Sequence, residues 1–235
     1  MFNYYLTNYA YGEEYKKIQD NLVEKASQSK FRAAVPVTRA MFETSNLYLE
    51  HKEFFDLKSI RAGHAWCSWK PYVIRSVMEQ LSDNDILVYM DVGDVWYDEL
   101  FDFMDNHFQH NEILVPDSPH EINKMWTTRD CFIEMDCNEE KYWNINQVEA
   151  GFCGFKVNDN TKKFCEIWLH YCLNNNGVAV KDDLETPHHG EPNFPEFKEH
   201  RTDQSILTNL LAKYNINPVE GNHFKTQCIR CNVTI

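Results

Sequence analysis

The sequence predicts an α/β fold with a mainly parallel central sheet flanked by helices, on two observations. The five apolar residues from Ile86 to Met90 run without a polar break, which is typical of a strand buried on both faces of a helix-covered sheet. Near the N-terminus, the segments 2–7, 13–28 and 31–35 have the patterns of a strand, a helix and a strand. Such a unit favours a right-handed crossover between parallel neighbours.

In this first unit, aromatic residues mark a strand from Phe2 to Thr7, and Tyr9-Ala10-Tyr11-Gly12 is expected to break it. Apolar residues then recur at helical spacing from Glu13 to about Gln28. The second strand, Phe31 to Val35, is expected to stop at Pro36. The end of the first strand, from Thr7 to Tyr11, is a natural ligand edge. There, Tyr9 or Tyr11 either stacks on a nucleobase or packs within the loop.

The next clear helix begins at Pro71, a residue favoured at the first helical position, and 40–60 has no clear assignment. The apolar stripe of the helix that begins at Pro71 consists of Val73, Ile74, Val77, Met78 and Leu81. Lys70 stands just before this helix N-terminus, where a lysine and the helix dipole together suit a phosphate. The alternative is a lysine that is simply solvated.

The C-terminal half continues the alternation, and no linker-like composition divides residues 1–235, so we expect one domain. Helices are predicted around 100–108 and 164–172, with strands at Ile113–Val115 and Glu149–Phe155. The segment 174–199 has three prolines and no periodicity, which suggests an active-site lid. A helix follows from about His200, where Asp203 is a plausible cap.

Composition excludes some classes of partner. The net charge of −13 repels nucleic acid and anionic membranes. No apolar run approaches the length of a membrane span, and the first residues do not resemble a signal peptide. The eight cysteines are scattered, so we expect free thiols in a reducing cytoplasm. Cys228 and Cys231 form a lone pair, which is a weak indication of a metal site.

Two aspartates, Asp91 and Asp94, follow the central strand, with Gly93 between them. Ligands of open α/β sheets bind at the carboxyl ends of such strands. Two carboxylates on one turn suit Mg²⁺ or Mn²⁺, and a glycine allows close approach to the backbone. The alternative is an ordinary polar turn.

Together with the glycine-bearing strand 149–155 and Asp203-Gln204 at a helix start, this motif resembles those of GT-A-fold glycosyltransferases. Three phrases are similar to a narrower group of bacterial and large-virus polysaccharide glycosyltransferases, including those of chlorella viruses: Trp69-Lys70-Pro71-Tyr72, Thr128-Arg129-Asp130 and His200-Arg201-x-Asp203-Gln204. The resemblance runs to about Leu211. It departs at Gly93, which stands where the family's Asp-x-Asp motif has its second carboxylate.

The resemblance implies a hexosyl- or deoxyhexosyltransferase with a nucleotide-sugar donor, UDP-linked in the first instance, and a glycan or glycoprotein acceptor. It implies Mn²⁺ or Mg²⁺ on Asp91, Asp94 and His223. Either Asp203 or Glu149 is the acceptor-side carboxylate. For a viral protein the location is the host cytoplasm. The donor-binding residues it implies are Thr7, Tyr9, Lys70, Gly93, Arg129, Asp130, Gln204 and Lys225.

Two alternatives remain open. A nucleotidyltransferase shares this type of sheet, but it carries a glycine-rich basic loop after the first strand, whereas residues 7–12 hold one glycine and no lysine. A non-catalytic nucleotide-sugar-binding domain is the other, with Gly93 marking a lost metal site. The sequence does not identify the donor sugar, the acceptor, the stereochemistry or the oligomeric state.

Overall fold

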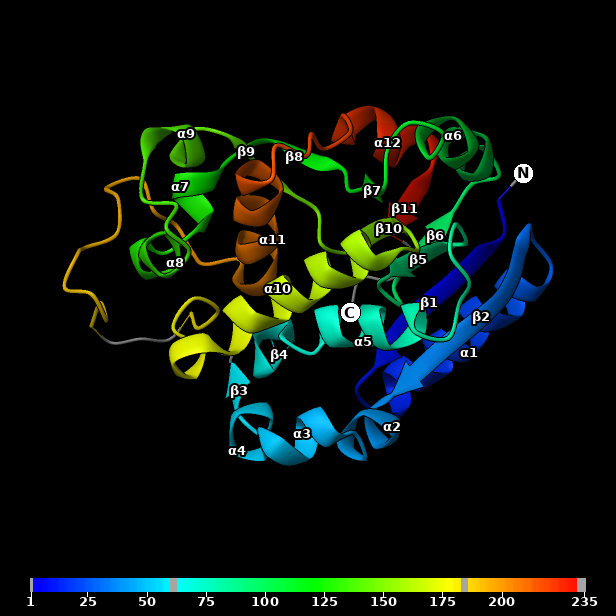
Figure 1. Cartoon of the computed structure of the whole chain (residues 1–235), viewed down its shortest axis with the longest axis horizontal. Helices are drawn as coiled ribbons and strands as arrows, with labels where there is room; N and C mark the ends of the chain where they lie inside the picture. The colour runs from blue at the N-terminus through cyan, green and yellow to red at the C-terminus, as the bar shows by residue number, and fades with distance from the viewer. Residues whose placement is uncertain (1, 60–62, 183–185, 232–235) are drawn as a thin grey trace.

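The computed structural model describes residues 2–59, 63–182 and 186–231. Its centre is a five-stranded sheet in the order β2-β1-β5-β10-β7 (Figure 1). In that order the strands span Phe31–Thr38, Tyr4–Ala10, Ile86–Met90, Phe152–Lys156 and Ile113–Leu114. Strands β2, β1 and β5 are parallel, whereas β10 is antiparallel to both β5 and β7. The predicted mainly parallel α/β sheet is confirmed, and β5 is an interior strand.

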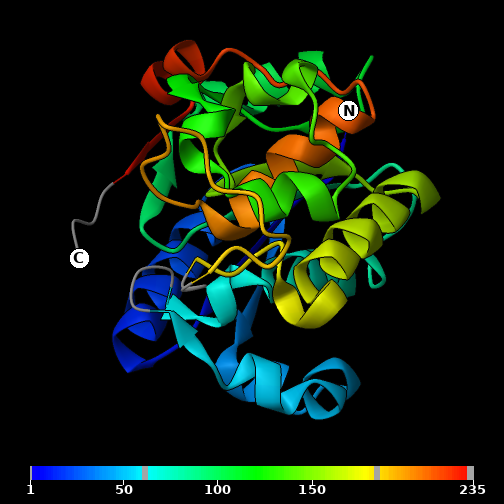
Figure 2. The same cartoon turned by 90° about the vertical axis from the view of Figure 1, so that its left-hand side faces the viewer.

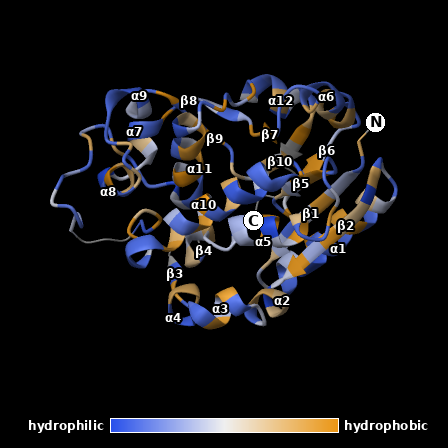
Figure 3. Cartoon of the chain, in the orientation of Figure 1, coloured by the Kyte–Doolittle hydropathy of each residue, from blue (hydrophilic) through white to orange (hydrophobic). Residues whose placement is uncertain are grey.

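Helices cover both faces of the sheet because side chains along each strand point alternately to its two sides. On β5, Leu87 and Tyr89 pack with α5, α10 and α11. Ile86, Val88 and Met90 pack with α1, α6 and α12 on the other face. Figure 3 shows hydrophobic residues along the strands of the central sheet. In numerical order the six helices span Glu13–Ser27, Lys70–Met78, Glu99–His107, Asp159–Gly177, Thr202–Lys213 and Gly221–Gln227.

The first β-α-β unit has the predicted connectivity, but both of its strands are longer than predicted. β1 continues to Ala10, and β2 runs through Pro36 to Thr38. Pro36 is tolerated because β2 is an edge strand of the central sheet, where a missing N–H breaks no second ladder. The end of β1 thus lies at Ala10, within the predicted ligand edge of Thr7 to Tyr11, and a ligand at this edge stays a prediction.

Shorter elements make up the rest of the described chain. The stretch without a clear assignment forms three short helices, and the predicted strand at Glu149–Phe155 is divided. Its first residues form a turn between β9 and β10, and β9 pairs with β8. β6 and β11 form a separate antiparallel pair. These elements are α2 (Arg39–Glu43), α3 (Asn46–Glu50), α4 (Lys52–Phe55), β3 (Lys58–Ser59), β4 (Gly63–His64), β6 (Asp94–Trp96), β8 (Asp117–Ile122), α7 (Asn123–Trp126), α8 (Arg129–Glu134), α9 (Glu140–Trp143), β9 (Asn146–Val148) and β11 (Ile229–Cys231), with a 3₁₀ turn at Ala65–Cys67.

The segment between α10 and α11 forms no helix or strand in its described parts, 178–182 and 186–201. It faces the viewer in Figure 2. No described helix is long and apolar enough to cross a bilayer. Every cysteine side chain within the described residues is a free thiol. Cys228 is buried, whereas the side chain of Cys231 lies outside the described residues, so the suggested pairing of these two remains a prediction.

Candidate functional site

Two adjoining cavities lie at the carboxyl end of β5. We call them the Asp203 cavity, of about 250 Å³, and the Lys225 cavity, of about 400 Å³. They share Asp91, Gly151 and Gln204 as lining residues. This is the position at which open α/β sheets bind their ligands.

Asp91 and Asp94 face the same space in spite of the extra residue between them. The Asp94 N–H donates to the Asp91 carbonyl at 2.9 Å, which closes a turn. The Asp91 N–H donates to the Gly151 carbonyl at 2.8 Å. A Cβ on Gly151 would lie 3.1 Å from Asp91 Oδ2 and 3.5 Å from Asp94 Oδ2. The turn, with half-buried Gly93 at its third position, thus brings both carboxylates over one glycine.

The two carboxylates fit a hard divalent cation. Asp91 Oδ1 accepts a hydrogen bond from the Tyr89 hydroxyl at 2.7 Å, and this leaves Oδ2 directed toward Gly151. Two carboxylate oxygens beside an open cavity suit Mg²⁺ or Mn²⁺, which complete their coordination with water and substrate phosphate. The absence of a side chain at Gly151 keeps the space beside these oxygens clear.

His223 does not join them. It lies exposed on α12, where its backbone N–H donates to the Glu220 carboxylate. Among the described residues, one group of three potential metal ligands has all its ligand atoms within 4.8 Å of one another. That group does not contain His223, Asp91 or Asp94. The described residues thus do not bring His223 together with Asp91 and Asp94, and its place in the metal shell stays a prediction. The spacing of residues in the sequence does not indicate in which direction the exposed face of α12, with His223, points.

Lys70 is buried behind the two aspartates, with only 4% of its surface exposed. Its Nζ donates to the Ala150 carbonyl at 3.0 Å and lies 3.3 Å from Asp203 Oδ2 and 3.7 Å from Asp91 Oδ1. Burial lowers the pKa of Lys70, but the carboxylates of Asp203 and Asp91 outweigh it and hold that pKa above its ordinary value. A solvated lysine is thus excluded, and the ammonium links two carboxylates.

Asp203 is the second residue of α11 and is 4% exposed. It does not cap the helix, because no side-chain cap hydrogen bond exists at the α11 start. Instead, Oδ2 faces Lys70 and Oδ1 accepts from the Thr202 hydroxyl at 3.2 Å. Thr202 has a φ of +47°, a conformation that costs a β-branched residue about 1–3 kcal/mol. Burial raises the pKa of Asp203, and Lys70 opposes that shift.

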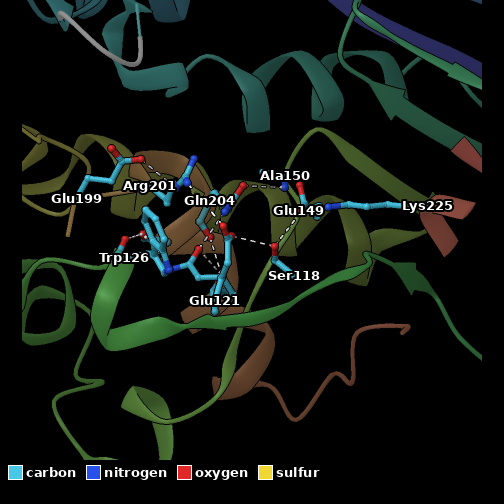
Figure 4. A network of polar contacts seen from close by, with 12 residues as sticks. Ser118, Glu121, Trp126, Glu149, Ala150, Glu199, Arg201, Gln204 and Lys225 are labelled. Carbon is cyan, nitrogen blue, oxygen red and sulfur yellow. Dashed lines mark hydrogen bonds and ion pairs between the residues drawn. The ribbon is translucent and has the colours of Figure 1, made fainter. Parts of the chain in front are cut away.

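Gln204, Glu149 and Lys225 line the Lys225 cavity. Figure 4 shows these three side chains with their polar contacts. Gln204 Oε1 accepts from the Ala150 N–H at 3.4 Å. Glu149 is ion-paired to Lys225 and accepts from the Ser118 hydroxyl at 2.9 Å. Glu149 is therefore held by a cation at the rim, whereas Asp203 lies deep in its own cavity.

The remaining residues implied by the resemblance have other partners. The Thr7 hydroxyl donates to the Val35 carbonyl, and the Tyr9 ring stacks on Trp69 at 4.0 Å within the core. The Arg129 guanidinium lies over two aromatic rings. The Asp130 carboxylate accepts backbone N–H groups of 188 and 189. None of these four residues lines either cavity, so their assignment to the donor is not supported.

Sequence reasoning missed Tyr89, whose hydroxyl orients Asp91. The available signal was a phenol within an otherwise aliphatic buried run. Tyr11, the alternative to Tyr9, has its ring 4.6 Å from the His64 ring and 4.5 Å from the Arg39 guanidinium. It packs among side chains.

His200 borders the Asp203 cavity as a buried neutral imidazole. Nδ1 accepts from the Thr128 N–H at 3.2 Å, so Nε2 carries the proton that it donates to the Ala179 carbonyl at 3.0 Å. Burial lowers its pKa to about 4, and burial also lowers the pKa of His64 to about 4. Both groups therefore resist protonation in the folded state.

These histidines predict acid sensitivity. Between about pH 6.5 and pH 4 the unfolded chain binds protons that the folded chain excludes, so stability falls as the pH falls through this window. Each histidine contributes up to about 1.4 kcal/mol per pH unit. Urea unfolding at pH 7 and pH 5 measures the slope. His200→Gln should reduce the slope and exposed His110→Gln should not; an unchanged slope in His200→Gln would contradict this account.

No protein-family model matches the sequence, and no curated protein matches it. Solved structures resemble it at low identity. Apo mouse xyloside xylosyltransferase 1 has a TM-score of 0.48 and 10% identity, over 93% of this chain and 84% of that one.

Two further structures are similar. A glycosyltransferase involved in glycosylation of the PBCV-1 major capsid has a TM-score of 0.41 and 9% identity, over 74% and 68% of the two chains. Galactosyltransferase LgtC with donor and acceptor sugar analogs has a TM-score of 0.43 and 12% identity, over 88% and 70%. All three are glycosyltransferases, the class that the sequence motifs resemble.

Proposed function

We propose that this chain is a glycosyltransferase that moves a sugar from a nucleotide-diphosphate sugar, UDP-linked in the first instance, to a hydroxyl of a glycan or glycoprotein acceptor. One observation carries the proposal. Asp91 Oδ2 and Asp94 Oδ2 converge over Gly151, where two cavities meet at the carboxyl end of the central strand. This arrangement suits a diphosphate bound through a divalent ion.

In this proposal Asp91 and Asp94 hold Mn²⁺ or Mg²⁺. The bound ion supplies positive charge that stabilises the leaving nucleoside diphosphate. Lys70 acts behind the carboxylates. Because its ammonium contacts both Asp91 and Asp203, it offsets the repulsion between their two negative charges. We therefore assign Lys70 to positioning the two aspartates and no longer to the phosphate.

Asp203 is the group best placed to act on the sugar side of the reaction. It lies in the cavity next to Asp91, and its pKa is raised by burial. A carboxylate with a raised pKa is a better proton acceptor than an ordinary one. In an inverting reaction it would take the acceptor's proton. In a retaining reaction it would stabilise the positive charge that develops on the sugar. Glu149 is the weaker candidate because Lys225 already neutralises it.

Product analysis separates this function from its alternatives. Glycosyl transfer or donor hydrolysis releases UDP from a UDP-sugar, whereas nucleotidyl transfer from a nucleoside triphosphate to a sugar phosphate releases pyrophosphate. A thermal-shift screen of nucleotide sugars identifies the donor, because a ligand that binds only the folded state raises its apparent stability. We expect UDP release from the donor that gives the largest shift. A shift with no turnover across many donors would favour a non-catalytic binding domain.

The space over Gly151 gives a further prediction. In Gly151→Ala the new Cβ lies 3.1 Å from Asp91 Oδ2, closer than ordinary van der Waals contact, and it intrudes beside the metal ligands. We expect the Mn²⁺ concentration for half-maximal activity to rise about tenfold or more. We expect only a small change in stability, because the reduced freedom of the unfolded chain favours folding and the tight contact with Asp91 opposes it.

Gly12→Ala is the matched control, because its Cβ meets nothing within 4 Å. It should leave the Mn²⁺ dependence unchanged. A wild-type Mn²⁺ profile in Gly151→Ala would mean that no ion occupies this space.

A further inference from the structure

Three potential metal ligands meet outside the two cavities. Glu134, His188 and His189 each offer one ligand atom, and the three atoms all lie within 4.8 Å of one another. None of the three residues lines the Asp203 or Lys225 cavity. The Glu134 side chain is only 8% exposed, while both histidines reach the surface. A buried carboxylate beneath two accessible imidazoles is open to an ion from solvent.

The fold holds these ligands through one helix face. Asp130 and Glu134 stand four residues apart on α8, so their side chains lie on the same face. The Asp130 carboxylate accepts the backbone N–H groups of His188 and His189 at 2.8 and 3.0 Å. Glu134 then faces the imidazoles, with Oε1 at 2.7 Å from His189 Nε2. The histidine backbone is therefore fixed independently of any contact between the imidazoles and Glu134.

Asn175 lies against the same group. Its Nδ2 is 3.0 Å from His188 Nε2 and 2.8 Å from Glu134 Oε1. The Asn175 amide nitrogen thus contacts Glu134 Oε1 and His188 Nε2 together, as a cation bound between these two atoms would. Amide nitrogen and oxygen are interchangeable by shape. A rotated Asn175 amide would present its oxygen to the same point as a fourth donor.

The donor set selects a different metal from the one proposed at Asp91 and Asp94. Two imidazole nitrogens and one carboxylate suit Zn²⁺ and related transition metals, whereas Mg²⁺ and Mn²⁺ prefer oxygen ligands. Zinc takes four ligands in tetrahedral geometry, and three protein ligands with a fourth from Asn175 or water meet that number. The Asp130 carboxylate next to the histidine backbone adds further negative charge to the surroundings of the site.

We propose that Glu134, His188 and His189 form a structural Zn²⁺ site. The ion would fasten the segment 186–199 to α8. That segment continues directly into Glu199, His200 and Arg201, which line the Asp203 cavity. The site would thereby stabilise one wall of that cavity without touching the substrate.

The test uses untagged protein of residues 1–235, stripped with EDTA and carrying Asp91→Asn, which removes the other proposed metal site. Isothermal titration with Zn²⁺ should show one equivalent bound, and the melting temperature should rise on binding. Glu134→Gln, His188→Ala and His189→Ala should each weaken binding about tenfold or more. Co²⁺ should give the visible absorption of a tetrahedral site, lost in the same variants.

Exposed His110→Ala is the control and should bind Zn²⁺ as its parent does. Glu134→Gln keeps the size of the side chain, and metal-free melting curves show whether each variant is folded. An affinity in Glu134→Gln equal to that of the Asp91→Asn parent would mean adventitious binding to surface histidines and would overturn the proposal. An absence of stoichiometric binding in the parent would overturn it equally. Neither outcome bears on Mn²⁺-dependent transfer.

Discussion

Asp91→Asn is expected to lower Mn²⁺-dependent UDP release by about 10²-fold or more. The amide can still accept the Tyr89 hydrogen bond at Oδ1, so the local fold is retained. It removes the negative charge opposite Asp94 that would hold the ion, and loss of one strong electrostatic group at a reacting centre costs roughly 10²–10³ in rate. Initial rates across Mn²⁺ concentrations measure the effect.

Asp83→Asn is the matched control for this variant. Asp83 is exposed and precedes β5, whereas Asp91 follows it, so the same change of charge occurs at the opposite end of one strand. The control should keep the activity of the parent protein. Comparable losses of activity in both variants would show a general effect of charge. Full activity in Asp91→Asn would contradict the assignment of Asp91 as a metal ligand.

Asp203→Asn is expected to reduce transfer by roughly 10²–10⁴-fold, the range for loss of a general acid–base group. The structure predicts only a moderate loss of stability. Burial raises the pKa of Asp203, so a neutral side chain is tolerated at this site. Lys70 keeps its contacts with Asp91 and the Ala150 carbonyl. We expect the free energy of unfolding to fall by about 1–3 kcal/mol.

In Asp203→Asn we therefore expect the turnover rate to be largely lost, while urea unfolding shows that the protein remains folded. Glu149→Gln provides the comparison at the rim, where Lys225 would lose its partner. We expect a smaller loss of turnover there. If Asp203→Asn is fully active and Glu149→Gln is not, the acceptor-side role passes to Glu149.

The sheet could be predicted where local pattern alone determines structure. Ile86–Met90 is apolar at every position because both faces of β5 are buried. The position of Pro36 could not be interpreted correctly, since only the sheet order shows that β2 is an edge strand. The segment 149–155 combined a turn and a strand, and its glycine content did not distinguish them.

The candidate site was predictable in its aspartates but not in their surroundings. Asp91 and Asp94 follow a recognisable strand, whereas the burial of Lys70 depends on partners 21 and 133 residues away in sequence. The direction of Asp203 depends on the left-handed backbone at Thr202, for which a threonine gives no warning. The surroundings of the two aspartates therefore depend on contacts between residues far apart in sequence, which the spacing of apolar residues does not indicate.

Binding of Mn²⁺ in the presence of UDP tests the central claim most directly. Electron paramagnetic resonance of untagged protein titrated with Mn²⁺ and UDP reports how much of the ion is immobilised. The account predicts one Mn²⁺ immobilised per chain with UDP, and a loss of that signal in Asp91→Asn. UDP binding with no Mn²⁺ immobilised by the wild-type chain would contradict it.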